Sequence, residues 1–204
     1  MLRSRGDVDQ SPPSPRPDDT LLVQRLRQRD AMALRAVYQR FSARIFRFLV
    51  RLCDGRRDVA EDLHQETWIA AARFAPRLQP STDLAAWLFT VARNKARSWR
   101  RWSILDLGRR NTHGDLAQAP AGIAEAVETR HDLTRALQAL PPIHREVLLL
   151  VGCEGLATEQ VGLILGIGKD AVRQRVSRAR AALAEALGSP VDAPVSGLRK
   201  EEIG

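Results

Sequence analysis

Five cationic and amide side chains near the carboxyl end of the chain have the chemistry needed to contact duplex DNA. The set consists of Lys169, Arg173, Gln174, Arg175 and Arg178. Arginine and lysine bind phosphate oxygens, and arginine and glutamine also form hydrogen bonds with base edges in the major groove. On a helix, Gln174 and Arg178 point away from the apolar positions of this segment, and Arg173 and Arg175 lie on the shoulders between the two sides.

A helix, a tight turn and a second helix are predicted to hold this set in place. The first helix spans about 158–165, the turn spans 166–168, and the second helix begins near Lys169. In the second helix Val172, Val176, Ala179 and Leu183 recur at helical spacing and predict one buried stripe. A short apolar helix that supports a cationic one places a recognition helix in a major groove. The pattern therefore predicts a DNA-binding element.

A second basic set lies upstream, on a helix predicted over about 82–102. It consists of Thr90, Arg93, Asn94, Arg97 and Arg101, opposite an apolar side with Leu84, Trp87, Leu88, Val91, Ser98 and Trp102. Arginines on such a face suit phosphates, the threonine and asparagine suit base edges, and aromatic rings can stack on an unpaired base. A solvated basic face explains this helix taken alone. The independent basic helix downstream favours nucleic-acid binding as the role of this helix as well.

An acidic face is predicted on a third helix, over about 58–74. It carries Asp58, Asp62 and Gln65, with Glu66 at its edge. Carboxylates repel DNA, so a protein partner is the natural use of this face. Surface acids that only keep the protein soluble explain the pattern equally well, and the residues by themselves leave both interpretations open.

The overall charge agrees with a polyanionic partner. The chain has 204 residues and a formal net charge of +8, with a pI near 10.8. Nucleic acid and an acidic membrane surface both fit such a balance. No apolar run is long enough to cross a bilayer and no signal-peptide core is present, which predicts a soluble cytoplasmic protein.

Patterns that would indicate an enzyme, a cofactor or a metal site are missing from the sequence. The histidines form no HExxH-type pattern, and there is neither a Gly-x-Ser-x-Gly elbow nor a glycine-rich phosphate loop. Cys53 and Cys153 have no metal-like spacing, and buried reduced thiols are expected for both. We therefore expect no enzymatic activity, no cofactor, no metal and no small-molecule substrate.

Composition divides the chain into two small all-α domains joined by a flexible tether. We expect a disordered proline-rich segment over 1–17, helical domains over 18–102 and 123–187, a linker over 103–122 and a mobile tail over 188–204. No segment alternates apolar and polar residues in the manner of a strand.

Three sequence motifs follow one another along the chain, namely AEDLHQETW at 60–68, AWLFTVARN at 86–94 and LPPIHREVLLL at 140–150. Their order resembles that of the extracytoplasmic-function (ECF) sigma factors, promoter-recognition subunits of bacterial RNA polymerase. Residues 60–68, AEDLHQETW, resemble the polymerase-binding motif of that family, and residues 86–94, AWLFTVARN, resemble its promoter-melting helix. Residues 140–150, LPPIHREVLLL, followed by the predicted helix-turn-helix, resemble its C-terminal domain. The resemblance covers about 18–187.

The resemblance implies a role for each set. Asp62, Gln65 and Glu66, on the face with Asp58, are expected to contact the clamp of the β′ subunit of core RNA polymerase. Asn94 is expected to hold a base flipped from the minus-10 element, within the set Thr90, Arg93, Arg97 and Arg101, while the loop 79–83 grips the melted strand. The set from Lys169 to Arg178 is expected at the minus-35 element. The resemblance further implies an anti-sigma partner and a free form whose domains pack together and hide the basic surfaces.

Some residues depart from the family pattern. Ser98 stands where many relatives carry asparagine or aspartate, and Gly168 offers no capping hydroxyl to the recognition helix. Lys169 adds a cation at that helix start. The competing interpretation is a free-standing helix-turn-helix regulator that never binds polymerase, and the acidic helix distinguishes the two because a simple repressor does not need it.

Overall fold

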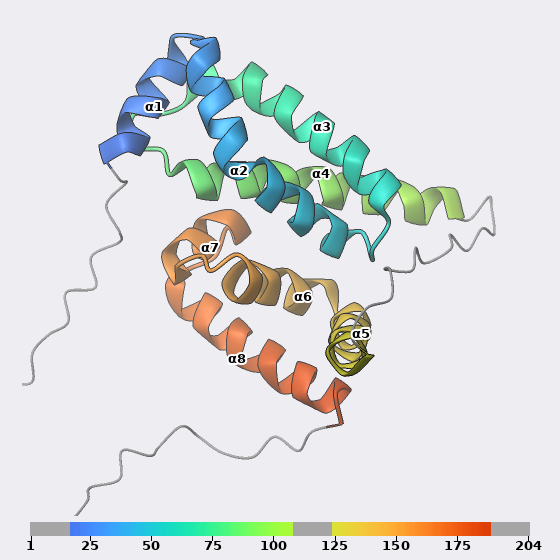
Figure 1. Ribbon diagram of the computed structural model, residues 1–204. Coiled ribbons are helices and arrows are strands. Elements are labelled where there is room, and N and C mark those ends of the chain that lie inside the picture. The colour runs from blue at the N-terminus through green and yellow to red at the C-terminus, as the bar shows by residue number, and fades with distance from the viewer. Residues whose placement is uncertain (1–16, 108–123, 189–204) are drawn as a thin grey trace, which may run out of the picture.

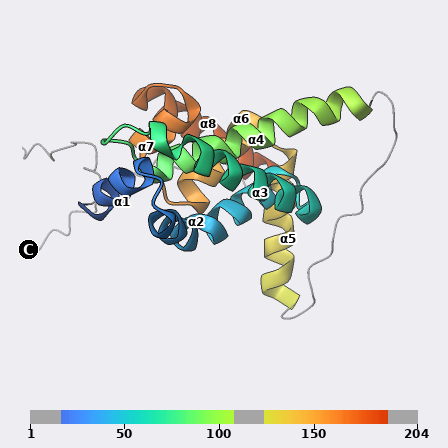
Figure 2. The ribbon, with the colours of Figure 1, turned by 90° about the horizontal axis from the view of Figure 1, so that it is seen from above.

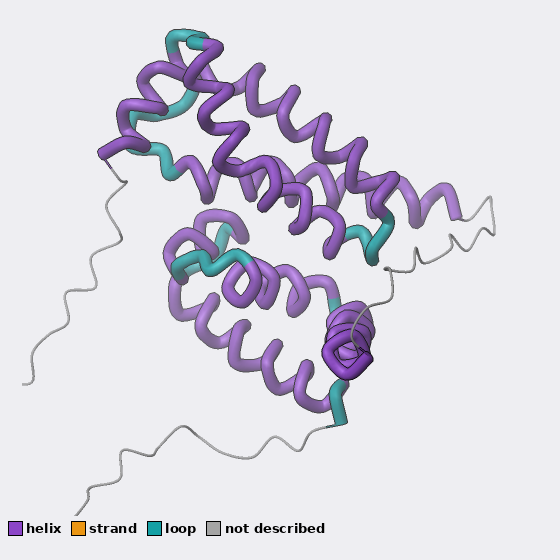
Figure 3. The backbone as a smooth tube through the Cα atoms, viewed as in Figure 1, coloured by secondary structure: helices purple, strands orange, loops and turns teal. Residues whose placement is uncertain are grey.

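The computed structural model describes residues 17–107 and 124–188, and all regular structure within these ranges is helical (Figures 1 and 3). An N-terminal domain contains α1 (Pro17–Arg27), α2 (Ala31–Leu52), α3 (Arg57–Phe74), the 3₁₀ turn η1 (Ala75–Arg77) and α4 (Leu84–Leu107). A C-terminal domain contains α5 (Ala124–Ala139), α6 (Pro142–Leu148), the π-helical turn η2 (Leu149–Cys153), α7 (Thr158–Leu165) and α8 (Lys169–Ala186). The predicted all-α fold is confirmed for this part of the chain.

Helix α2 is the centre of the N-terminal domain. Its side chains at three- and four-residue spacing, among them Val37, Phe41, Ile45 and Phe48, are essentially inaccessible to solvent. The ring of Phe48 meets that of Phe89 on α4 edge to face, with 5.1 Å between centroids. Helices α3 and α4 both pack against α2 and against each other, so one apolar stripe on each helix builds a shared core.

Carboxylate caps fix where two of these helices begin. Asp30 accepts hydrogen bonds from the backbone N–H groups of Met32 (2.8 Å) and Ala33 (3.2 Å) and thereby starts α2. Asp83 accepts one from the N–H of Ala86 (2.8 Å) and starts α4 in the same way.

The two domains pack against each other through α4, which lies against α7 (Figures 1 and 2). Buried side chains of both domains form one continuous apolar cluster, which includes Phe89 and Ala92 of α4 and Val161 and Ile164 of α7. The two domains therefore share a closed arrangement, as the resemblance implies for the free protein.

The structure also corrects several sequence-based predictions. Helix α4 continues to Leu107, so the first residues of the predicted linker are helical. The predicted core position Trp102 is 70% exposed, because the C-terminal end of α4 extends past the N-terminal end of α3 (Figure 2). The remainder of the predicted linker, the N-terminal segment up to residue 16 and the tail from residue 189 lie outside the described residues.

Candidate nucleic-acid interface

Helix α8 presents three of the five residues of the predicted recognition set to solvent. Arg173, Gln174 and Arg178 are exposed, whereas Lys169 and Arg175 are partly buried. On the opposite side Val172 and Ala179 are buried against the rest of the domain, which confirms the predicted apolar stripe at these two positions. The helix therefore displays cations and an amide outward from a fixed apolar base.

Two carboxylates modulate the charge of this set. Lys169 forms an ion pair with Glu159 on α7, and this hydrogen bond lowers the pKa of the Glu159 carboxyl. Arg173 forms an exposed ion pair with Asp170 one turn earlier, at 3.1 Å. The cation that Lys169 adds at the helix start is thus partly balanced within the helix-turn-helix.

Glycines make the tight turn of the helix-turn-helix possible. Gly166 ends α7 in the left-handed region at a φ of 69°, which glycine adopts without steric cost. A Cβ atom on Gly162 would lie 2.8 Å from the backbone oxygen of Ile167, so the chain passes too close for any side chain. The need for Gly162 was not recognised from the sequence, although a glycine within a short helical pattern is a signal for such an approach.

Helix α4 carries the second basic set, and most of it faces outward. Asn94, Arg97 and Arg101 are exposed, and Thr90 is partly buried. The Thr90 hydroxyl donates a hydrogen bond to the carbonyl oxygen of Ala86 at 2.7 Å, which fixes the orientation of that side chain. These residues recur at helical spacing and form one polar stripe.

Arg93 differs from the other members of this set because it lies in the domain interface. The residue is only 8% exposed. Its Nε atom donates to Oε2 of Glu146 on α6 at 2.8 Å, and Nη1 donates to the carbonyl oxygen of Ile164 on α7 at 3.2 Å. In this closed arrangement Arg93 cannot contact DNA, so its predicted contact requires the domains to separate.

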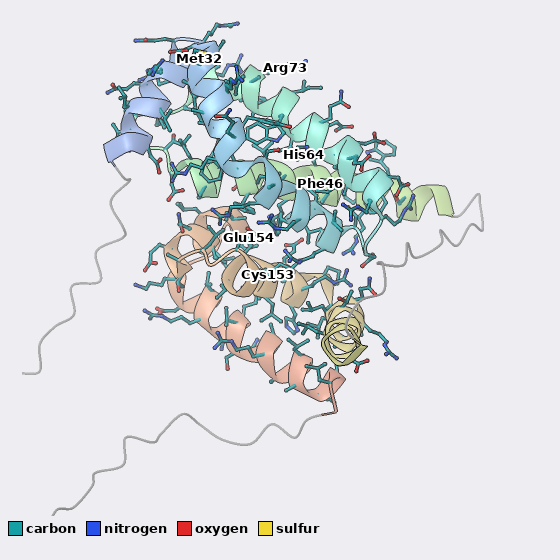
Figure 4. The ribbon with its side chains drawn as sticks, in the orientation of Figure 1. Met32, Phe46, His64, Arg73, Cys153 and Glu154 are labelled. Carbon is teal, nitrogen blue, oxygen red and sulfur yellow. The ribbon has the colours of Figure 1, made fainter. Side chains whose placement is uncertain are left out.

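Further charged contacts connect the domains at three other points. Glu154, nearly buried, accepts from Nε of Arg44 at 3.2 Å and lies 3.6 Å from Arg51, both on α2 (Figure 4). Asp54, which follows α2, pairs with Arg145 on α6. Gln160 on α7 donates to Oδ2 of Asp83 at 2.7 Å. The loop predicted to grip melted DNA is therefore held by the C-terminal domain at its last residue, Asp83.

Helix α3 presents the acidic face to solvent. Asp58, Asp62, Gln65 and Glu66 are all exposed, next to the exposed apolar side chains of Tyr38 and Ile69. Glu66 pairs with Lys95 of α4 at 2.8 Å. The backbone N–H of Val59 and the Arg56 guanidinium lower the pKa of Asp58 at the helix start. Exposed apolar side chains beside acids and an amide are suited to a protein partner.

His64 has a structural position on the inner side of this helix (Figure 4). Its Nε2 atom accepts a hydrogen bond from Nε1 of Trp68 at 3.0 Å and lies 3.1 Å from the Ser42 hydroxyl of α2. An indole N–H only donates, so Nε2 must be unprotonated and the imidazole neutral. Burial lowers the pKa of His64 accordingly.

The two cysteines occupy different environments, and both are free thiols. Cys53 is buried, and desolvation raises its pKa to about 12. The prediction of burial is wrong for Cys153, because the π-helical turn η2 leaves that side chain at the surface. Within the described ranges no cluster of potential metal ligands occurs and no helix is long and apolar enough to cross a membrane.

Two family models match the two domains. Residues 37–102 match sigma-70 region 2, and residues 130–183 match sigma-70 region 4. The first match contains the acidic face and the basic stripe of α4, and the second contains the helix-turn-helix.

Individual relatives support the same assignment. The chain is 33% identical to the RNA polymerase sigma factor CarQ of Myxococcus xanthus, over 81% of this chain and 95% of CarQ. It is 32% identical to the ECF RNA polymerase sigma factor SigL of Mycobacterium tuberculosis, over 76% of this chain and 88% of SigL.

Solved structures resemble the fold. The sigma factor RpoE of Bartonella quintana, solved with the anti-sigma factor NepR, is 29% identical and matches with a TM-score of 0.65 over 76% of this chain and 96% of RpoE. CnrH, solved with the cytosolic domain of CnrY, matches the fold with a TM-score of 0.65 at 24% identity, over 83% of this chain and 97% of CnrH. With both sigma-70 regions matched and relatives aligned over most of their length, this chain belongs to the ECF RNA polymerase sigma factors and is not an enzyme.

Proposed function

We propose that this sigma factor divides its work among three helices. The exposed face of α3, with Asp58, Asp62, Gln65 and Glu66, docks on the β′ clamp of core RNA polymerase. The stripe on α4 holds the opened minus-10 element, with Asn94 receiving a flipped base. The outer side of α8 reads the minus-35 element in the major groove. The observation that carries this division is the separation of exposed acids on α3 from exposed arginines on α4 and α8.

Charge explains why the faces are separate. Acids beside the arginines would repel phosphates, while basic residues on the docking face would draw it to DNA rather than to protein. The pairing of Glu66 with Lys95 places the docking face next to α4. Docking on polymerase therefore brings the α4 stripe close to the DNA that polymerase holds.

The closed arrangement is the resting state in this proposal. Arg93 and Asp83 are occupied by Glu146 and Gln160, so the C-terminal domain competes with the opened strand for groups at the α4 stripe. Promoter binding requires the two domains to separate, because the minus-10 and minus-35 elements lie at different positions along the DNA. The tether then keeps the second contact at high effective concentration after the first has formed.

A partner that holds the closed form fits this arrangement. The Bartonella quintana RpoE structure contains the anti-sigma factor NepR. We extend this to the present chain as an anti-sigma factor that keeps the domains together, and we place the protein in the cytoplasm, where polymerase acts.

Co-purification with bacterial core RNA polymerase, followed by run-off transcription from candidate promoters, tests the proposal. The pair Gln65→Ala and Glu66→Ala is expected to abolish polymerase association with the fold intact, because both side chains are exposed. The control pair Gln24→Ala and Glu185→Ala lies at exposed positions away from the acidic face of α3. This pair is expected to retain polymerase association. Duplex binding without any polymerase association would favour the free-standing regulator instead.

A further inference from the structure

A cavity of about 420 Å³ lies between the two domains, and its polar wall is dominated by arginine. Four arginines come from α4 and one from α8, namely Arg93, Arg97, Arg100, Arg101 and Arg175. Pro142 and Ile143 of α6 and Ile167 of the tight turn form an apolar wall. The cavity needs the closed arrangement, because its walls come from both domains.

The positive charge around this cavity is only partly balanced. Arg93 pairs with Glu146, the one carboxylate among the described residues that line the cavity, and Arg100 lies 3.5 Å from Asp54. Within the described part of the chain, Arg97, Arg101 and Arg175 form no ion pair. Like charges gathered on facing walls repel one another and oppose closure. An anion bound between them would relieve that repulsion.

The chemistry of the cavity indicates what kind of anion fits. Guanidinium groups bind phosphate oxygens through two parallel hydrogen bonds, so several arginines together suit a chain of phosphates. The volume lies within the usual range of about 300–1,000 Å³ for small-molecule sites. The apolar wall of Pro142, Ile143 and Ile167 offers a surface for a flat ring. A cavity of about 420 Å³ is too small to hold duplex DNA.

We propose that this interdomain cavity binds a small molecule that carries a chain of phosphates, such as a nucleoside polyphosphate, and that the bound anion stabilises the closed form. A ligand bridging the two domains binds the closed state better than the open one and shifts the population towards closure. By reciprocity, promoter DNA that requires the open state weakens binding of the anion. This regulation goes beyond promoter recognition and is measurable without polymerase.

Isothermal titration calorimetry of the full chain at about 0.15 M ionic strength tests the site, with sodium tripolyphosphate and GTP as probes. We expect saturable binding of one anion per chain. Ile143→Asp places a carboxylate at the cavity wall, and its side chain is 46% exposed, so the fold tolerates it. This variant is expected to weaken binding by about tenfold or more, because like charges are brought together. Leu163→Asp, at a 67% exposed position outside the cavity, is the matched control and is expected to bind as the unaltered chain does.

A second variant keeps the test decisive if Ile143→Asp perturbs folding. Arg175→Gln removes the one arginine contributed by α8 and is expected to weaken binding as well, because both domains contribute to the site. Tighter binding of GTP than of tripolyphosphate would identify a nucleotide as the ligand, and equal binding would identify the phosphate chain alone. Absence of saturable binding, or equal losses in Ile143→Asp and Leu163→Asp, would overturn the proposal. Neither result depends on whether the chain supports transcription.

Discussion

The two basic helices of this protein carry similar residues but differ in how closure affects them. On α8 the side chains of Gln174 and Arg178 stay exposed in the closed form. On α4 Arg93 is buried and bound by Glu146, although Arg97 and Arg101 on the same helix remain exposed. Closure therefore acts on the helix expected to hold melted DNA more than on the helix expected to read duplex DNA. The implied hiding of the basic surfaces is thus complete only for Arg93 of α4, while Arg175 of α8 is partly buried.

This difference has a physical origin in the interface. Helix α4 lies against α7, so any long side chain on that side must be paired or excluded. Glu146 and the carbonyl oxygen of Ile164 satisfy the Arg93 guanidinium. On α8, by contrast, apolar side chains such as Val172 and Ala179 are buried, while Gln174 and Arg178 lie on the exposed side.

Breaking the Arg93–Glu146 pair should give the largest effect on this comparison. Glu146→Ala leaves a buried guanidinium unpaired, a change that costs about 3–5 kcal/mol in a fixed structure. Opening of the domains lets Arg93 reach water, so we expect the loss to appear as domain separation. Small-angle X-ray scattering should show a larger radius of gyration, and DNA binding by α4 should increase. Arg178→Ala should leave the scattering unchanged, and a closed Glu146→Ala variant would show that the pair does not hold the interface.

A substitution at Gly162 of α7 tests the tight turn that holds α8 in place. Gly162→Ala places a Cβ 2.8 Å from the Ile167 oxygen and forces the turn to shift. Overpacking of this kind costs about 1–3 kcal/mol, so a lower thermal unfolding midpoint and weaker minus-35 binding are expected. Gly168→Ala is the control, because a Cβ there meets nothing within 4 Å. Equal stability of the two variants would contradict the close approach.

The salt dependence of DNA binding tests whether the exposed arginines of α8 contact phosphates. Arg173→Ala together with Arg178→Ala is expected to reduce the slope of log affinity against log salt by about 2, since each phosphate contact contributes about one counterion. Fluorescence anisotropy on duplex DNA with a minus-35 element measures this slope. Arg35→Ala with Arg73→Ala, at exposed positions on α2 and α3, should not change it. An unchanged slope in the first pair would remove α8 from the phosphate interface.

The smallest expected effect is a pH dependence of folding stability. It arises from His64 on α3, the docking helix, and not from α4 or α8. The pKa of His64 is lowered on folding, so the unfolded chain binds its proton more readily. Stability from neutral His64 is therefore present above the ordinary pKa of about 6.5 and is lost as pH falls below it. Urea unfolding between about pH 5 and 7 measures this loss. In His64→Gln, the free energy of unfolding should change less with pH between about pH 5 and 7. An unchanged pH dependence in this variant would show that another group causes it.

Local features of the sequence predicted most of the fold. The bounds of α7 and the start of α8 agree with expectation, because Gly166 and Gly168 interrupt the helical pattern there. The buried side of α2 likewise follows from apolar residues at three- and four-residue spacing, such as Val37, Phe41 and Ile45. Exposure of the acidic face and of Asn94, Arg97 and Arg178 also follows from helical periodicity. Their contacts with polymerase and DNA remain predictions.

Side-chain environments that depend on distant segments could not be predicted from periodicity. Phe74 of α3 is apolar yet 48% exposed, and Trp102 is exposed because no helix of the described part of the chain covers that end of α4. His64 sits against Ser42 of another helix, and Cys153 reaches the surface through a π-helical turn. Periodicity shows which side of a helix is apolar but not how far a neighbouring helix extends over it.

By itself, the sequence determined the all-helical fold, the helix-turn-helix and the separation of acidic from basic faces, because these depend on residue spacing and capping within one helix. Only the tertiary structure decided that Arg93 pairs with Glu146, that Asp83 is held by Gln160 and that arginines of both domains surround one cavity. These contacts join residues far apart in the chain. Their energies depend on burial and on the distance between charges, which are set only when the two domains pack together.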